Sequence, residues 1–256
     1  MELTNQNYFS QAANQKYMSA SQFKDFLKCP SYAIAKIKGE WVEEKSTSLL
    51  IGSYIDSYYE GTLDKFKEEN PNIYKKDNTL KAEYKKADEI IERLKKDLFF
   101  SKYMSGKKQV IMTGTIENVP FKIKIDSFHE NKCIVDLKIV KDMMPIWINN
   151  EKKNFVEAWG YDIQMAIYQE IVFQNTGNRL PTILCVGTKE TVTDLALLQI
   201  DQERLDYVME YIIKPNLSIF QNIKQQNQTI EKCGKCDYCK SIKKIDAIIN
   251  YKDIDF

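Results

Sequence analysis

The sequence predicts a single α/β domain with a helical insertion, and three observations carry that prediction. Between Gln109 and Val140, runs of strand-forming residues are separated by polar turn residues, as in an antiparallel meander. Apolar residues recur at helical spacing both before and after these runs. The 256 residues contain no internal repeat and no low-complexity linker that would divide them into separate domains.

The composition is that of a globular protein with little net charge. Apolar residues make up 43% of the chain, and 12 Phe with 15 Tyr are ample for a packed core. The net charge of +1 neither demands nor excludes nucleic acid, because a basic groove can lie on a neutral protein. The first residues lack the pattern of a secretion signal, and no apolar run approaches the roughly 20 residues that span a bilayer. We therefore expect a cytoplasmic protein without a membrane partner.

The first part of the chain, over residues 1–108, is expected to be helical. Ser19 and Gln22 have the spacing of a capping box, at the start of a helix that ends before Pro30. A second helical stretch reads SLLIGSYIDSYYEG. The Lys- and Glu-rich region that follows contains a long helix, whose apolar face is formed by Leu80, Tyr84, Ala87, Ile91 and Leu94. Its lysines indicate a solvated face, and some of them are candidates for lining a phosphate-binding channel.

The middle part, over residues 109–225, is expected to be the core of the domain. QVIMTGTIE, PFKIKIDSF and KCIVDLKIV are the three strands of the meander. A helix that opens near Lys152 continues through EAWGYDIQMAIYQEIVF, which shows helical periodicity through Val156, Trp159, Ile163 and Ile167. PTILCVGT and VTDLALLQI form a second strand pair, and LDYVMEYIIK another helix. A Cys-rich tail over residues 226–256 completes the domain.

Two strands of the meander carry charges that need an explanation. Alternation along a strand places Asp136 and Lys138 on one face, and Lys122, Lys124 and Asp126 on one face of the preceding strand. A hairpin with an odd number of loop residues would pair Asp126 with Asp136, so that both carboxylates converge beside Lys138. Oxygen ligands with an ammonium nearby suit Mg²⁺ or Mn²⁺ acting on a phosphate ester. The spacing alone also fits an ordinary ion pair between Asp136 and Lys138.

These residues carry a resemblance to a known family. Asp126, a turn, and then the triplet DLK that begins at Asp136 resemble the core of the PD-(D/E)xK nuclease superfamily. Downstream, Gln164 and Tyr168 in YDIQMAIYQ match the Q-x-x-x-Y motif of its RecB-like branch. Upstream, SASQFKDFLKCPSYA and LLIGSYIDSYYEG occupy the places of that branch's opening helix and its G-x-x-x-H segment. The matching motifs cover most of the chain in order. The enzymes that the sequence resembles most are RecE-type (exonuclease VIII-like) enzymes of phages and prophages.

The resemblance implies a fold and an activity. The fold would be a restriction-endonuclease-like core, with a central mixed sheet flanked by helices. The activity would be that of a Mg²⁺-dependent exonuclease that degrades one strand of linear double-stranded DNA from a 5′ end. The 3′ single strands that remain would be used by a RecT-like annealing protein. Enzymes of this type are often ring-shaped homo-oligomers, and they work in the bacterial or phage-infected cytoplasm.

The resemblance also assigns a metal site and a catalytic lysine. Asp126 and Asp136 would bind the metal, helped by the backbone carbonyl of Leu137. Lys138 would orient or deprotonate the attacking water and stabilise charge on the phosphate. The family's histidine metal ligand falls at Asp56, which still offers an oxygen ligand but puts metal affinity and preference in doubt. The alternative for this last residue is a solvent-facing position on a helix.

Gln164 and Tyr168, one helical turn apart, would lie on the same face of their helix. By resemblance, Gln164 is a further catalytic residue, and both would contact DNA near the scissile phosphate or steady Lys138. Their alternative is a core or capping role. Three rival functions also stay open. They are a cluster-bearing nuclease of the type associated with CRISPR adaptation, a DNA-binding module of this fold that has lost its chemistry, and an iron–sulfur electron-transfer protein.

Four of the six cysteines have the spacing of metal ligands, with one upstream and three in a C-x-x-C-x-x-C run. These four are Cys29, Cys233, Cys236 and Cys239. They could bind a four-iron cluster or a zinc ion, or remain free thiols. Some RecB-like nucleases resemble this layout and hold a [4Fe–4S] cluster, although their last gap is usually longer than two residues. Cys133 and Cys185 lie within predicted strands and are expected to be small buried apolar residues.

Overall fold

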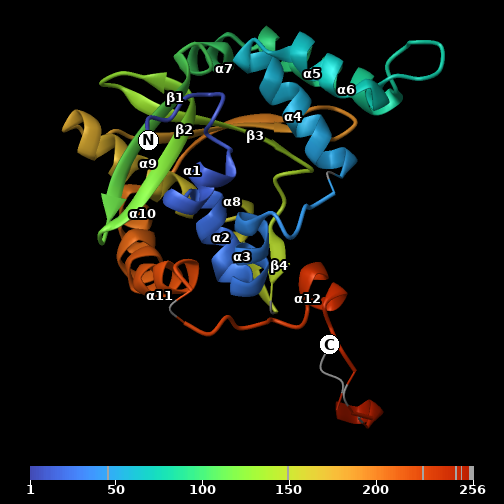
Figure 1. Ribbon diagram of the computed structural model, residues 1–256. Coiled ribbons are helices and arrows are strands. Elements are labelled where there is room, and N and C mark those ends of the chain that lie inside the picture. The colour runs from blue at the N-terminus through green and yellow to red at the C-terminus, as the bar shows by residue number, and fades with distance from the viewer. Residues whose placement is uncertain (45, 149, 227, 246, 249, 254–256) are drawn as a thin grey trace.

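A five-stranded mixed sheet crosses the computed structural model, which describes residues 1–253 except 45, 149, 227, 246 and 249 (Figure 1). In spatial order its strands are β1 (Lys107–Ile116), β2 (Val119–His129), β3 (Cys133–Val140), β6 (Thr182–Thr188) and β7 (Leu195–Gln199). Neighbours are antiparallel except for β3 and β6, which run parallel. The predicted fold class, a mixed central sheet flanked by helices, is therefore confirmed.

In the sequence, the described helices lie either before β1 or after β3. Those before β1 are α1 (Gln11–Lys16), α2 (Ala20–Lys28), α3 (Pro30–Lys38), α4 (Thr47–Glu60), α5 (Leu63–Glu69), the 3₁₀ turn η1 (Pro71–Ile73), α6 (Ala82–Lys96) and α7 (Leu98–Tyr103). Later elements are the strands β4 (Ile146–Ile148) and β5 (Glu151–Lys153), the helices α8 (Phe155–Ala158), α9 (Tyr161–Thr176) and α10 (Gln202–Val208), the π-helical turn η2 (Met209–Ile213), the helices α11 (Lys214–Lys224) and α12 (Asp237–Ser241), and the turn η3 (Tyr251–Asp253).

The helices cover the two faces of the sheet with separate apolar cores. Figure 1 shows α4–α7 gathered on one side of the sheet and α9–α11 on the other. On the first side, Tyr54 and Leu94 pack with Val135 of β3, and all three are fully buried. On the second side, Ile167 and Ile171 of α9 belong to the larger core. Each such buried side chain contributes roughly 1.5–3 kcal/mol from removal of apolar surface from water.

Local sequence signals set the start and end of the helices that surround the sheet. The Ser19 hydroxyl accepts a hydrogen bond of 3.3 Å from the backbone N–H of Gln22, as the capping-box spacing predicts. The helix α2 then ends before Pro30. The helix α4 stops at Gly61, whose φ of 75° is the left-handed conformation that glycine adopts without strain.

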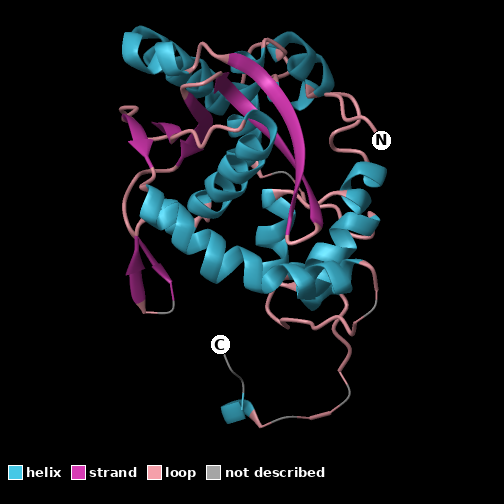
Figure 2. Cartoon of the chain, turned by 90° about the vertical axis from the view of Figure 1, so that its left-hand side faces the viewer, coloured by secondary structure: helices cyan, strands magenta, loops and turns pink. Residues whose placement is uncertain are grey.

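The prediction of a continuous helix opening near Lys152 is wrong. That residue belongs to the small β4–β5 sheet, which Figure 2 shows at the periphery of the molecule. The helical segment begins only after Asn154, whose side chain caps α8, and Gly160, at a φ of 62°, then interrupts it. Trp159 lies at this break with 58% of its surface exposed, instead of joining the buried face of α9. A single residue in the left-handed conformation is enough to end a helix that apolar periodicity alone would continue.

The division into a helical part, a core and a Cys-rich tail stays a prediction. Residues 227, 246, 249 and 254–256 of the predicted tail lie outside the described residues. Among the described helices, none combines the length and the apolar character that a bilayer span requires.

Candidate active site

Asp126 lies on β2 where the pairing of the sheet is interrupted on both sides. Towards β3, the paired residues end at Ser127 and Val135, so the register sets Asp126 opposite Asp136 and confirms the predicted register. Towards β1, the pairing omits Gln109, which the register would place opposite Asp126. The carboxylate therefore stands in a local gap of the hydrogen-bond ladder.

The Asp126 side chain takes up the backbone group that this gap leaves free. Its Oδ2 accepts a hydrogen bond of 2.9 Å from the backbone N–H of Leu137, and its Oδ1 accepts one of 3.4 Å from Gln109 Nε2. Gln109 has a φ of 51°, a left-handed conformation that is uncommon for a residue with a side chain. Backbone strain of this kind is often found at functional sites.

Asp136 and Lys138 share one face of β3, as alternation predicts. Asp136 is only 2% exposed, and one carboxylate oxygen forms an ion pair with the Lys138 ammonium. The other, Oδ1, accepts a hydrogen bond of 2.6 Å from Gln164 Nε2 on α9. The ammonium also lies 5.0 Å from the centre of the Tyr161 ring. Burial alone would lower the pKa of Lys138, but attraction to Asp136 and Asp126 outweighs burial and raises that pKa above the usual lysine value.

Asp56 reaches the same pocket from α4. All the predicted site residues of the nuclease motifs line this pocket of about 920 Å³, and they are Asp56, Asp126, Asp136, Leu137, Lys138, Gln164 and Tyr168. Burial, followed by repulsion from Asp126, raises the pKa of Asp56 well above its usual value. Burial and then repulsion from Asp136 raise the pKa of Asp126 to about 7. The carboxylates are thus close enough to oppose one another's ionisation.

The residues present fit a divalent cation. The donor set consists of carboxylate oxygens from three separate elements, which are the hard ligands that Mg²⁺ and Mn²⁺ prefer. Burial and then repulsion from neighbouring carboxylates raise the pKa values of Asp56 and Asp126, so both effects oppose the ionised carboxylates in the absence of a cation. A cation between them would favour the ionised forms, because its positive charge would offset the repulsion between the carboxylates.

Tyr168 is placed by its own hydrogen bond to the sheet. Its hydroxyl donates to the backbone carbonyl of Lys124 over 2.9 Å, and the side chain is buried. Gln164, one turn earlier on α9, points to Asp136. The two residues of the motif therefore hold neighbouring strands, β2 and β3, while both line the pocket. Contact of either residue with DNA stays a prediction.

The pocket has basic residues that the motifs did not indicate. Its lining includes a set of lysines from several elements, namely Lys24, Lys36, Lys65, Lys108, Lys122 and Lys124. Burial lowers the pKa of both Lys24 and Lys122 to about 8. Alternation placed Lys122 and Lys124 on the strand face of Asp126, and the pocket lining includes both. Lys24 and Lys36 lie on α2 and α3, and no local pattern points from those helices to the pocket.

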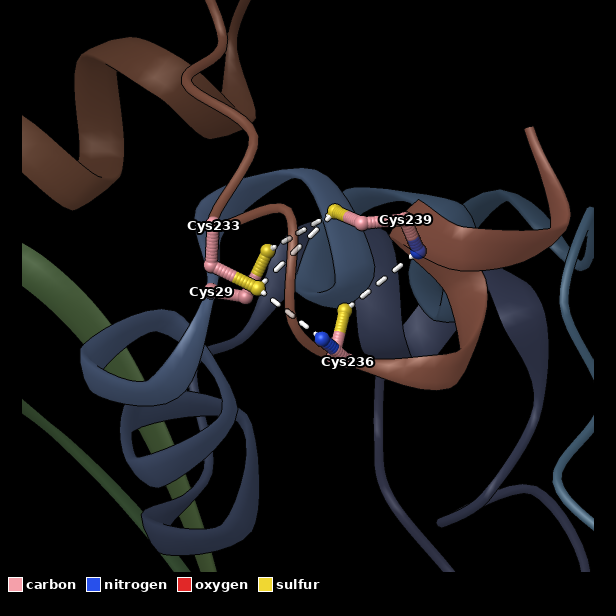
Figure 3. Close-up of side chains that lie close together, drawn as sticks. All are labelled: Cys29, Cys233, Cys236 and Cys239. Atoms are coloured by element: carbon pink, nitrogen blue, oxygen red, sulfur yellow. Dashed lines mark hydrogen bonds between the residues drawn. The ribbon is translucent and has the colours of Figure 1, made fainter. Parts of the chain in front are cut away.

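Outside this pocket, four cysteines meet in one group. Figure 3 shows the sulfur atoms of Cys29, Cys233, Cys236 and Cys239 directed towards one another. All four sulfurs lie within 4.8 Å of one another. The sequence-predicted metal ligands are thus brought together, although they are up to 210 residues apart in the chain. As expected, the remaining two cysteines are buried in strands.

The sequence matches the model of a protein family described as a PDDEXK-like domain of unknown function (DUF3799), over residues 19–242. The chain is also similar to a protein from Eubacterium rectale whose crystal structure is described as that of a candidate exonuclease. The two are 42% identical with a TM-score of 0.95, and the match covers 99% of this chain and 98% of the other. The crystal structure of SSO0001 is 11% identical over 84% of this chain and 87% of its own, and its TM-score of 0.29 is too low to carry an argument. Among curated proteins, none matches the sequence significantly.

Proposed function

The chain belongs to the family of PDDEXK-like domains matched over residues 19–242, and on this premise we propose that it is a metal-dependent exodeoxyribonuclease. The observation that carries the proposal is that the carboxylates of Asp56, Asp126 and Asp136 line one pocket together with the Lys138 ammonium. Asp126 and Asp136 come from neighbouring strands, and Lys138 is paired with the second of them. The likeness to a candidate exonuclease from Eubacterium rectale supports the same class of reaction.

We assign the metal site to the carboxylates of Asp56, Asp126 and Asp136, with the backbone carbonyl of Leu137 as a further ligand. A bound Mg²⁺ or Mn²⁺ would lower the pKa of a water molecule and neutralise charge on the leaving oxygen of a phosphodiester. Lys138 holds a positive charge at the edge of this acidic group, where it can orient the water and stabilise negative charge on the phosphate. The chemistry is therefore hydrolysis assisted by fixed charges that surround the scissile bond.

The lysines that line the pocket support a polyanionic substrate. They come from α2, α3, α5, β1 and β2. Lys122 is buried, and Lys36, Lys65 and Lys124 each form an ion pair with a carboxylate of the pocket lining. Lys24 and Lys108 are the two members of this set without an ion pair among the described residues, and they are the best placed to attract phosphate. Phosphate contacts of this kind dominate affinity for DNA and make it sensitive to salt. We propose linear double-stranded DNA as the substrate, with one strand degraded from its 5′ end as in RecE-type enzymes. The 3′ single strand would then be taken up by a RecT-like annealing protein in the cytoplasm, and the enzyme would work as a ring-shaped oligomer.

Digestion of end-blocked DNA tests this proposal. Duplexes that carry nuclease-resistant phosphorothioate linkages at either both 5′ ends or both 3′ ends are incubated with Mg²⁺, and parallel samples contain a chelator. We expect degradation of the 3′-blocked duplex, protection of the 5′-blocked duplex and of closed circular DNA, and no activity with chelator. Protection by 3′ blocks instead would reverse the proposed polarity. Failure to cleave any DNA with Mg²⁺ or Mn²⁺ would favour a DNA-binding module without catalysis.

A further inference from the structure

The spacing of the four cysteine sulfurs distinguishes between the metal centres that the sequence left open. Cys29 Sγ and Cys239 Sγ are 3.6 Å apart, and Cys233 Sγ and Cys239 Sγ are 3.9 Å apart. A tetrahedral zinc ion with Zn–S bonds of about 2.3 Å requires sulfur–sulfur distances of about 3.8 Å. A [4Fe–4S] cube places iron and sulfide between its cysteines and separates their sulfurs to roughly 6 Å. No pair of sulfurs in this group exceeds 4.8 Å, so the space suits one ion and not a cube.

The backbone around the tail cysteines has the form of a metal-binding turn. The backbone N–H of Cys236 donates to Cys233 Sγ over 3.3 Å, and that of Cys239 donates to Cys236 Sγ over 3.4 Å. Hydrogen bonds of this kind stabilise negative charge on sulfur, which is the form that binds a metal. Gly234, within the first C-x-x-C, adopts a φ of 71° that few other residues tolerate. The backbone of the turn therefore already directs its N–H groups to the cysteine sulfurs.

Aromatic side chains enclose one side of the group. Cys29 and Cys239 are buried with Tyr32, while Trp41 and Tyr238 pack against them. The two partly buried rings meet edge to face at a centroid distance of 5.7 Å. Such a shell limits the access of water and protects thiolate–metal bonds from exchange. It resembles the surroundings of a structural site, which is closed, more than those of a catalytic site with an open position.

From the sulfur spacing, the turn and the shell, we propose that Cys29, Cys233, Cys236 and Cys239 hold one structural zinc ion. All four ligands are thiols, and tetrahedral S₄ coordination is typical of zinc. The ion fastens the segment of α12 to the junction of α2 and α3. Lys24 and Lys36 of these two helices line the catalytic pocket. The zinc site therefore fastens the tail to two helices that contribute to the pocket lining, and the proposal does not depend on the nuclease activity.

Metal analysis of the intact protein tests the proposal without any variant. The protein is purified under anaerobic conditions, and zinc, iron and acid-labile sulfide are measured per chain. We expect about one zinc per chain with no sulfide. Iron and sulfide in equal amounts of about four per chain would overturn the proposal, and so would protein that contains neither metal. Replacement of zinc by Co²⁺ should give the intense visible absorption of tetrahedral thiolate coordination, saturating at one equivalent.

Matched cysteine variants locate the ion. Cys233→Ser removes an exposed ligand and should therefore leave the fold intact while zinc content falls at least about tenfold. Its melting temperature should fall by several degrees, because the ion binds only the folded chain. Cys133→Ala removes a buried thiol that is not in the group and should keep one zinc per chain. Full zinc content in Cys233→Ser would refute the assignment even if the nuclease activity of both variants were unchanged.

Discussion

Gln164 of α9 donates a hydrogen bond of 2.6 Å to Asp136 of β3, so two motifs that are 28 residues apart meet at one carboxylate oxygen. The bond fixes the orientation of a carboxylate that is almost completely buried. Because the other oxygen of Asp136 contacts Lys138, both sides of the carboxylate are held by protein. Gln164 therefore acts on the proposed metal site through Asp136, which makes it a positioning residue.

Gln164→Leu should slow cleavage by about 10- to 100-fold, the usual effect of losing a residue that orients a metal ligand. The loss should be accompanied by a weaker apparent affinity for Mg²⁺, measured from the dependence of the cleavage rate on metal concentration. Gln174→Leu is the matched control, because Gln174 lies on the same helix but its amide contacts Thr115. Equal rates and metal affinities in the two variants would show that the bond to Asp136 has no role in the reaction.

Lys138→Met should lower the rate of cleavage by about 100- to 1,000-fold, since it removes the positive charge proposed to stabilise the phosphate. DNA binding should persist, because other lysines line the pocket. The measurement is single-turnover cleavage together with a binding assay on the same duplex. Lys141→Met serves as control, since the Lys141 side chain is 94% exposed at the end of the same strand region. Wild-type cleavage by Lys138→Met would remove this lysine from the mechanism.

Asp56→His restores the residue type that the resemblance places at this position. Imidazole favours transition metals over Mg²⁺, so the ratio of activity with Mn²⁺ to activity with Mg²⁺ should rise by at least about threefold. Asp56→Ala should lower activity with both metals. Asp64→His, on an exposed position of α5, should leave the ratio unchanged. If both Asp56 variants keep the wild-type ratio and rate, Asp56 is not a metal ligand.

Lys122→Met should change how stability depends on pH. Lys122 is 1% exposed, and its ammonium contacts the Tyr8 carbonyl and the Asn14 side chain. Burial lowers its pKa to about 8 from the usual 10.5. Between these two values the unfolded chain binds a proton that the folded chain lacks, so this lysine makes stability rise with pH in that window. In Lys122→Met the rise is lost.

The melting temperature of Lys122→Met minus that of the wild type should therefore fall as the pH increases from about 7 to about 10. Taking the difference cancels the titration of groups that do not interact with Lys122, whereas Lys224, whose pKa is lowered by burial and then by the charge of Lys122, contributes to the difference. Lys76→Met, in an exposed loop, should give a difference that does not depend on pH. A constant difference for Lys122→Met would mean that the buried lysine keeps its ordinary pKa.

Gln109→Gly should stabilise the fold and weaken the site. Gln109 has a φ of 51°, and relief of this strain by glycine should add about 1 kcal/mol to the free energy of unfolding. The same change removes the amide that contacts Asp126, so cleavage should be slower. Asn78→Gly, at a φ of 60° in a loop that does not line the pocket, should show a smaller gain without loss of activity. Denaturant unfolding and a cleavage assay measure the two effects.

The part of the site that could be predicted from sequence is the part that depends on strand geometry. Side-chain alternation places Asp136 and Lys138 on one face whatever surrounds them, and an odd hairpin loop sets Asp126 opposite. The lysines of α2 and α3 could not be predicted, because their direction depends on how helices pack. Gln109 was also missed, since its role arises from an interruption of pairing that leaves no mark in the residue pattern.

The fold shows the same division between local and tertiary signals. Capping at Ser19 and most of the apolar face of α6 were readable because neighbouring residues determine them. Leu80 was wrongly assigned to that face, because it precedes the helix and forms a β-bridge with Tyr74. The break of the helix at Gly160 was not readable, because the apolar spacing continues across it. The strands β4 and β5, each three residues long, are too short for alternation to stand out from chance.

The contact between Cys29 and Cys239 closes a loop that spans 210 residues and contains the whole sheet and most residues of both cores. Because the ion binds only the folded chain, its binding free energy adds to the free energy of unfolding of the loop as a whole. Much of that stabilisation would reach segments that never touch the ion. Release of zinc should thus weaken resistance to unfolding throughout the molecule, so that hydrogen exchange accelerates in the sheet as well as next to the cysteines.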